Sequence, residues 1–267
     1  MIRDITIGQY YPASSVLHRL DPRTKTIGTL AYIVSLFVVN NWGYTVCTFY
    51  LAALILISKV PFKFMVKGLR ALLVILILTM AINAFLTPGQ VLFQWKFIKI
   101  TIEGLKMAGL MGLRLVYLIL GASLLTLTTT PNQMTDGLER LLSPLKIFKV
   151  PVHEIAMMMS IALRFIPILL DETDKIMKAQ TARGADFETG GIAKRIKAMV
   201  PLFVPLFVSA FRRANDLALA MEARCYHGGE GRTQMKPLRY KRRDYIAFVI
   251  IAAALALVIV LRAVLHW

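Results

Sequence analysis

The chain has few charged residues, few acidic residues among them, and only two cysteines. Charged side chains make up 18% of its 267 residues and hydrophobic ones 57%, whereas about 25% of an average soluble domain is charged. A soluble domain this apolar would expose large apolar patches to water, so the composition indicates a membrane protein. Cys47 and Cys225 are too few and too far apart for a disulfide framework or a cysteine metal cluster.

The sequence also lacks the motifs of several enzyme classes. It contains no G-x-x-x-x-G-K-[ST] segment, so it has no P-loop to hold the phosphates of ATP. The four histidines are scattered without an H-E-x-x-H pair, and no G-x-S-x-G elbow occurs. We therefore expect no bound cofactor, no metal and no enzymatic activity in this chain.

Five apolar segments approach the ~20 residues that a helix needs to cross a bilayer. They are residues 26–40, 42–58, 69–86, 105–128 and 245–265. The N-terminal segment and the four links between these segments carry 4, 0, 4, 2 and 19 Lys and Arg residues in chain order. Because Lys and Arg accumulate in cytoplasmic loops, this alternation predicts a cell-membrane protein with a cytoplasmic N-terminus, about five crossings and an outside C-terminus. The same bias explains the net charge of +17, so we expect no nucleic-acid partner.

The segment 129–243 has the character of a folded helical domain. It holds 19 basic and 11 acidic residues and two long patterns in which apolar residues recur every three or four positions. We expect two long amphipathic helices at the cytoplasmic membrane face, with their apolar sides against lipid or a partner. The residues expected at these contacts are Met158, Phe165, Leu202, Leu206, Phe207 and Phe211.

The predicted fold is therefore all-α: a membrane domain in 1–128, cytoplasmic helices in 129–243 and a last transmembrane helix in 244–267. An alternative has residues 155–170 and 199–211 crossing the bilayer. These runs have 16 and 13 residues, which is short for a crossing. Their crossing would also place a basic link outside, so the charge pattern disfavours it.

The two amphipathic patterns end alike. Residues 179–184 read AQTARG and residues 220–225 read AMEARC, so Arg183 and Arg224 hold matching positions 41 residues apart. One such site alone is an ordinary helix ending, because arginine favours the negative C-terminal end and glycine a left-handed cap. Two copies on neighbouring helices indicate a pair of binding sites, since small alanines admit a close partner and a guanidinium binds a carboxylate bidentately.

The chain resembles the transmembrane T-component of energy-coupling-factor transporters, the ATP-driven vitamin and metal importers of prokaryotes. The resemblance rests on SVLHRLDPRTK at residues 15–25, LRFIP at 163–167 and Ala-Arg-Gly at 182–184, whose second copy has Cys225 in place of glycine. It implies two cassette ATPases, which bind the ATP, and one substrate-binding membrane S-component as partners. It further implies that both motifs dock into grooves on the ATPases and transmit their movement to the S-component. The ATPase contacts would be Ala182, Arg183, Gly184, Ala223, Arg224 and Cys225.

A self-contained permease or secondary transporter is the alternative function. Such a protein needs polar or charged groups that converge at mid-membrane, and the expected spans offer little beyond Arg114 and Asn83. Arg114 either pairs with a neighbouring helix or faces the S-component. Arg164, on the first amphipathic pattern, is expected to pair with an acidic residue such as Glu172, since a half-buried arginine needs a partner.

Overall fold

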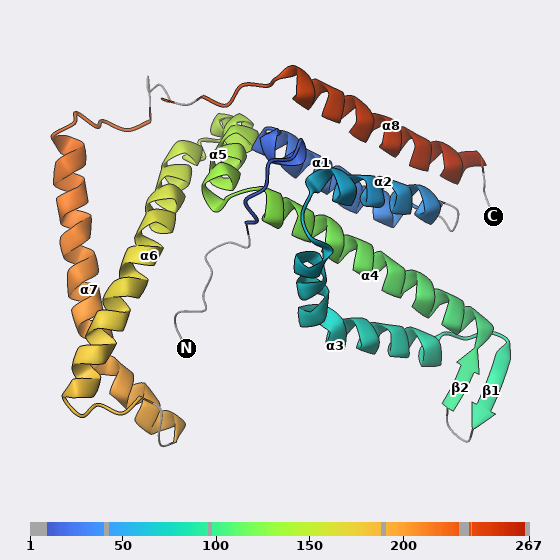
Figure 1. Cartoon of the computed structure of the whole chain (residues 1–267), viewed down its shortest axis with the longest axis horizontal. Helices are drawn as coiled ribbons and strands as arrows, with labels where there is room; N and C mark the ends of the chain where they lie inside the picture. Colours follow the sequence, from blue (N-terminus) through green and yellow to red (C-terminus); the bar gives the residue numbers. More distant parts are fainter. Residues whose placement is uncertain are drawn as a thin grey trace. The chain divides into compact units, whose positions relative to one another are not determined.

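The computed structural model describes residues 10–39, 43–95, 98–187, 191–229, 235 and 237–264. Figure 1 shows its elements, which are α1 (Pro22–Val38), α2 (Gly43–Ser58), α3 (Phe62–Leu86), β1 (Val91–Trp95), β2 (Ile98–Thr101), α4 (Ile102–Thr128), α5 (Pro131–Leu142), α6 (Val152–Ala182), α7 (Ile192–Glu222) and α8 (Arg242–Val264). Two 3-10 turns, η2 (Leu17–Arg19) and η3 (Ser143–Phe148), precede α1 and follow α5. The expected helical class is confirmed, and the antiparallel hairpin of β1 and β2 adds a short element that the apolar patterns did not predict.

The chain folds into two compact units. The larger unit consists of Gly8–Gly137 and Leu238–Trp267, and the smaller unit includes Leu138–Pro237. Helices α1, α2, α3, α4 and α8 belong to the larger unit, and α6 and α7 to the smaller.

The core of the larger unit lies among α1, α2, α4 and α8, while α3 packs along α4. Leu36, Cys47, Leu51 and Leu124 are among its buried residues. Gly121 on α4 is needed for this packing, because a Cβ atom there would overlap the ring of Tyr32 on α1.

Polar contacts bring three helix ends to one end of the larger unit. The Asp21 side chain caps α1 by accepting the backbone N–H of Arg23 at 3.0 Å. The Asp244 side chain, at the start of α8, accepts the backbone N–H of Asp21 at 2.8 Å. Lys25 donates to the carbonyl of Thr128, at the end of α4, at 2.8 Å. The starts of α1 and α8 therefore adjoin the end of α4.

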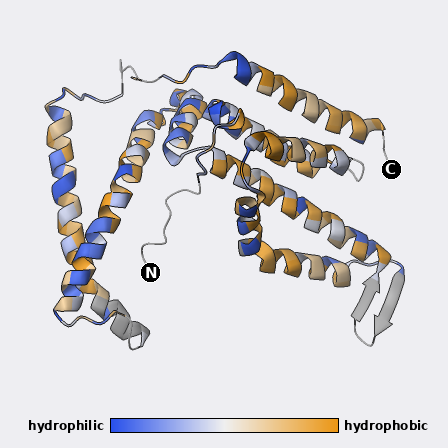
Figure 2. Cartoon of the chain, viewed as in Figure 1, coloured by the Kyte–Doolittle hydropathy of each residue, from blue (hydrophilic) through white to orange (hydrophobic). Residues whose placement is uncertain are grey.

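The expected membrane spans fall on α1, α2, α3, α4 and α8 where those residues are described. By length and composition, α4, α6 and α8 can each cross a membrane, and α3 makes a fourth span if its two parts, Phe62–Arg70 and Leu72–Leu86, act as one. Helices α1 and α2 have 17 and 16 residues, fewer than the ~20 of a full crossing. Figure 2 shows α8 as nearly continuously apolar beyond its first turn, whereas polar and apolar residues alternate along α6 and α7.

In the smaller unit, α6 and α7 coincide with the two amphipathic patterns that predicted helices. They contact each other, and Figure 1 shows that they cross. An imidazole–carboxylate contact of 2.8 Å between His153 and Glu139 links the start of α6 to α5. The smaller unit therefore contains two long helices in contact, α6 ending at Ala182 and α7 ending at Glu222.

Candidate functional site at two matching helix ends

Helix α6 ends in a Schellman turn around Arg183. The backbone N–H of Ala185 donates to the carbonyl of Gln180 at 3.0 Å, and that of Gly184 donates to the carbonyl of Thr181 at 2.9 Å. Gly184 has φ +89°, a left-handed conformation that glycine adopts without steric cost. These bonds satisfy carbonyls of the last helical turn and leave the Arg183 side chain outside the turn.

Helix α7 ends in the same turn around Arg224. The N–H of Tyr226 donates to the carbonyl of Met221 at 3.1 Å, and that of Cys225 donates to the carbonyl of Glu222 at 2.9 Å. Each bond thus recurs after a displacement of 41 residues. Cys225 takes the place of Gly184 and is also left-handed, with φ 57°. The two arginines accordingly have the same local backbone.

Both ends are open to contact. The residues predicted to bind a partner there are exposed: Ala182, Arg183, Gly184, Ala223, Arg224 and Cys225. An added Cβ atom at Gly184 would meet nothing within 4 Å. The small neighbours of each arginine therefore leave room for a partner surface to approach it.

An ion pair joins α6 to α7. Arg213 donates to the carboxylate of Glu172 at 3.0 Å, and the Ser209 hydroxyl and Arg213 hold the pKa of Glu172 below its usual value. The expected pair between Arg164 and Glu172 is wrong. Arg164 precedes Glu172 by eight residues on the same helix, roughly 12 Å along its axis, whereas Arg213 approaches from the facing helix.

Arg164 and Arg224 both line an open hollow of about 650 Å³ between α6 and the end of α7, together with Ser160, Tyr226 and His227. None of the described residues that line it is acidic. Two guanidinium groups in one hollow favour an anionic group such as a carboxylate. Sequence reasoning did not predict that Arg164 and Arg224 line one hollow, because the two residues are 60 positions apart and share no motif.

The six apolar residues expected at partner or lipid contacts differ in exposure. Leu202 is buried, and Phe165 and Leu206 are half-buried. Met158, Phe207 and Phe211 are 58%, 62% and 69% exposed. Large exposed apolar side chains on one pair of helices are typical of a protein or membrane contact.

Two further sequence expectations concern the membrane interior and metals. The Nε–H of Arg114 on α4 donates to the hydroxyl of Tyr44 on α2 at 2.9 Å, a contact to a neighbouring helix and the first of the two alternatives for this residue. Its guanidinium lies 5.7 Å from the ring centre of Phe37.

Within the described part of the chain, no three His, Cys, Asp or Glu residues are grouped so that they could hold a metal ion.

Comparison with known proteins identifies the family. The model of the CbiQ family of cobalt transport proteins matches residues 13–235. The chain is 56% identical over 250 residues to the energy-coupling factor transporter transmembrane protein EcfT of Clostridium kluyveri, covering 92% of this chain and 93% of that protein. It is 56% identical over 247 residues to EcfT of Ruminiclostridium cellulolyticum, with 92% of each covered, and 49% identical over 265 residues to EcfT of Bacillus subtilis, with 98% and 100% covered. The chain therefore belongs to the CbiQ family as an EcfT transmembrane protein of energy-coupling factor transporters, a transporter subunit and not an enzyme.

Proposed function

We propose that this chain couples two cassette ATPases to one substrate-binding membrane S-component, for the uptake of a vitamin or another micronutrient. The ATPases bind and hydrolyse ATP, and the S-component selects the substrate. The observation that carries the proposal is the recurrence of one exposed, Schellman-capped arginine at the ends of two crossing helices, Arg183 and Arg224. Two equivalent sites suit two equivalent ATPase subunits.

Each arginine inserts into a groove of one ATPase and binds a carboxylate there. The planar guanidinium supplies two parallel hydrogen bonds, which a lysine cannot. Arg164 adds positive charge to the hollow between α6 and α7 that Arg224 also lines. Removal of one partner of a buried, hydrogen-bonded charge pair costs about 2–5 kcal/mol, so each arginine contributes strongly to assembly.

The exposed apolar side chains of α6 and α7 contact the S-component and the membrane surface. Met158, Phe207 and Phe211 form the exposed part of this contact, and Phe165, Leu206 and Leu202 support it from beneath. ATP-driven closure of the ATPase pair displaces the two helix ends, and the apolar faces pass this displacement to the S-component. The contact must remain adaptable if it is to transmit movement, which suits flexible Met158.

The N-terminus and the helices of 129–243 lie on the cytoplasmic side. The contacts of Asp21, Lys25 and Asp244 support this orientation, because they gather the ends of α1, α4 and α8 that the Lys and Arg count assigns to one membrane face. Although α6 is long enough to span, it carries Arg164, Asp171, Glu172, Asp174, Lys175 and Lys178. Charged side chains are costly in hydrocarbon, so α6 and α7 lie outside it.

The test compares Arg183→Ala, Arg224→Ala and the double variant at equal membrane abundance. Substrate uptake and co-purification of the ATPases are measured. Each single change should reduce uptake strongly, and the double change should abolish uptake and release the ATPases. Lysine at either position should restore part of the activity, because it supplies charge without the bidentate geometry.

Arg212→Ala is the matched control, since Arg212 is an exposed arginine on α7 away from both helix ends. It should leave uptake and assembly unchanged. Normal uptake by the double variant would contradict the coupling role. Both motifs would then only terminate their helices.

A further inference from the structure

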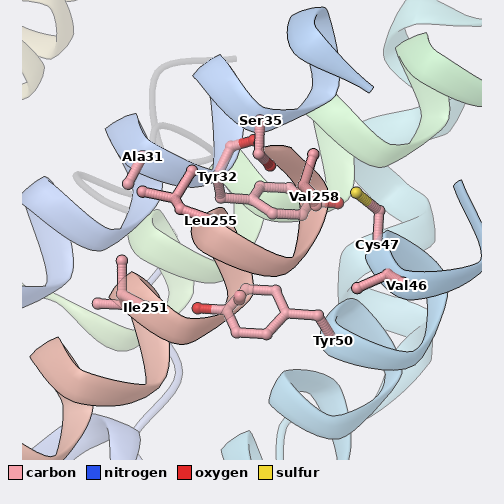
Figure 3. A pocket seen from close by; sticks show the side chains of 10 residues that line it. Ala31, Tyr32, Ser35, Val46, Cys47, Tyr50, Ile251, Leu255 and Val258 are labelled. Atoms are coloured by element: carbon pink, nitrogen blue, oxygen red, sulfur yellow. The ribbon is translucent and has the colours of Figure 1, made fainter. Parts of the chain in front are cut away.

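The larger unit contains an apolar groove between α2 and α8, with α1 and α4 behind it. Its volume is about 230 Å³, and its lining includes Ala53 and Leu54 of α2 and Ile246, Ala247 and Ile250 of α8. Figure 3 shows Tyr32 of α1 and Tyr50 of α2 beside α8 at a smaller cavity. The groove shares these two residues and Ile251 with that cavity.

Two buried hydroxyl groups in the lining have no hydrogen-bond partner. Thr24 and Tyr32 are only 1% and 5% exposed, and among the described residues neither hydroxyl finds a donor or acceptor. A buried polar group without a partner is destabilising. Both side chains belong to α1, and because their oxygen atoms have almost no accessible surface, they present carbon atoms to the groove and leave this wall apolar.

One end of the groove is positively charged. Lys25 and Arg243 line it there, and neither forms an ion pair among the described residues. Lys25 donates to the carbonyls of Thr128 and His18, which uses two of the three hydrogens of its ammonium group. The nearby carboxylates are already engaged: Asp21 pairs with Arg23 at 2.9 Å, and Asp244 accepts backbone N–H groups.

We propose that this groove holds an anionic phospholipid. Its phosphate group lies between Lys25 and Arg243, at the end of the unit where α1 and α8 begin. Its acyl chains follow the apolar walls formed by α2 and α8. The lipid links α2 to α8 where their side chains leave space.

The choice of a lipid over a partner helix rests on the mixture of groups in the groove. A purely apolar partner helix would cover the walls but would supply no anion to Lys25 and Arg243. A phospholipid supplies an anion and ester oxygens at one end and hydrocarbon at the other. The surrounding bilayer also supplies it in great excess.

The experiment measures thermal unfolding of the purified full chain in detergent. Dioleoylphosphatidylglycerol, dioleoylphosphatidylcholine or inorganic phosphate is added at equal concentration. A ligand that binds the folded state raises the unfolding temperature. We expect the anionic lipid to raise it most, the zwitterionic lipid less, and phosphate not at all. Equal shifts with the two lipids would contradict the proposed headgroup site, and an equal shift with phosphate would contradict a lipid occupant.

Two variants locate the site. Arg243→Gln should lose most of the extra shift with the anionic lipid, whereas Arg242→Gln, which changes the adjacent exposed arginine outside the lining, should keep it. Ala247→Phe fills the groove and should remove the shift with both lipids. An equal loss in both arginine variants, or an unchanged shift in Ala247→Phe, would overturn the proposal.

A second readout needs no variant. The wild-type chain is irradiated with phosphatidylglycerol that carries a diazirine on an acyl chain, and the crosslinked peptides are mapped. We expect crosslinks at the walls of the groove, in residues 50–57 and 246–251. Crosslinks spread evenly over the apolar helices would contradict a specific site. Loss of the S-component from a complex that carries Ala247→Phe, with an unchanged lipid shift, would assign the groove to a protein partner instead.

Discussion

Arg213 donates a hydrogen bond to Glu172 at 3.0 Å across the crossing of α6 and α7, and the two residues are 41 positions apart, as are Arg183 and Arg224. Arg183 follows Glu172 by eleven residues and Arg224 follows Arg213 by eleven, which is roughly 16 Å of helix in each case. Each arginine thus lies the same number of residues beyond the residue of its own helix that forms the ion pair.

The ion pair at this crossing should make stability depend on acid pH. The pKa of Glu172 is lowered from its ordinary value of 4.5 by the Ser209 hydroxyl and Arg213. The stabilisation is therefore fully present above the unfolded-state pKa and is lost as pH falls through the lower folded value. Glu172→Gln should unfold at a lower temperature than the wild type at pH 7. Its free energy of unfolding should fall by at most about 1 kcal/mol, since the pair is partly exposed. In acid the two proteins should unfold at the same temperature.

Thermal unfolding of the full chain from about pH 7 to pH 3 measures this effect. Asp171→Asn is the control, because it removes an exposed carboxylate one residue away and should keep the wild-type profile. A Glu172→Gln profile parallel to that of the wild type at every pH would exclude a contribution from the pair.

Substitutions of Cys225 should reveal the importance of its left-handed backbone. Cys225→Gly should be tolerated, since glycine adopts φ 57° without steric cost. Cys225→Val should weaken the turn by about 1–2 kcal/mol, because a branched side chain clashes in this conformation, and should displace Arg224. ATPase co-purification at matched abundance is the measurement. Equal assembly with glycine and valine would mean that the turn at this end does not position the arginine.

The two cysteines should report the membrane orientation. Cys225 is exposed and Cys47 is buried. A membrane-impermeant maleimide should label Cys225 in inside-out vesicles but not in intact cells, and Cys47 should react slowly from either side. The labelling of the Cys225→Ser variant gives the background of the measurement. Labelling of Cys225 from outside intact cells would reverse the orientation assigned from the Lys and Arg count.

The exposed apolar face of α7 should be needed for assembly. Phe207→Asp places a carboxylate where a side chain that is 62% exposed meets a partner, and burial of an unpaired charge costs several kcal/mol. Arg212→Ala should have little effect, since an exposed charge contributes about 1 kcal/mol or less. Retention of the S-component after purification is measured. Arg213 is unsuitable as the control because it binds Glu172. Equal retention by both variants would show that this face meets no partner.

The local features of this protein followed from its sequence. Apolar periodicity predicted α6 and α7 because a helix returns to the same face every 3.6 residues. The repeated AQTARG and AMEARC segments predicted the two matching helix ends, since helix termination depends on residues adjacent in the chain. The hairpin of β1 and β2 was not predicted, because two strands this short leave almost no periodic signal.

Only the tertiary structure decided which distant residues meet. The sequence suggested Glu172 as the partner of Arg164. In the structure Glu172 binds Arg213 of the facing helix instead, and Arg164 lines the hollow that Arg224 also lines. The groove lined by α1, α2, α4 and α8 likewise joins residues as far apart in the chain as Lys25 and Arg243. Such contacts depend on where helices cross and how they rotate, and these are set by the packing of many side chains at once, which no local pattern encodes.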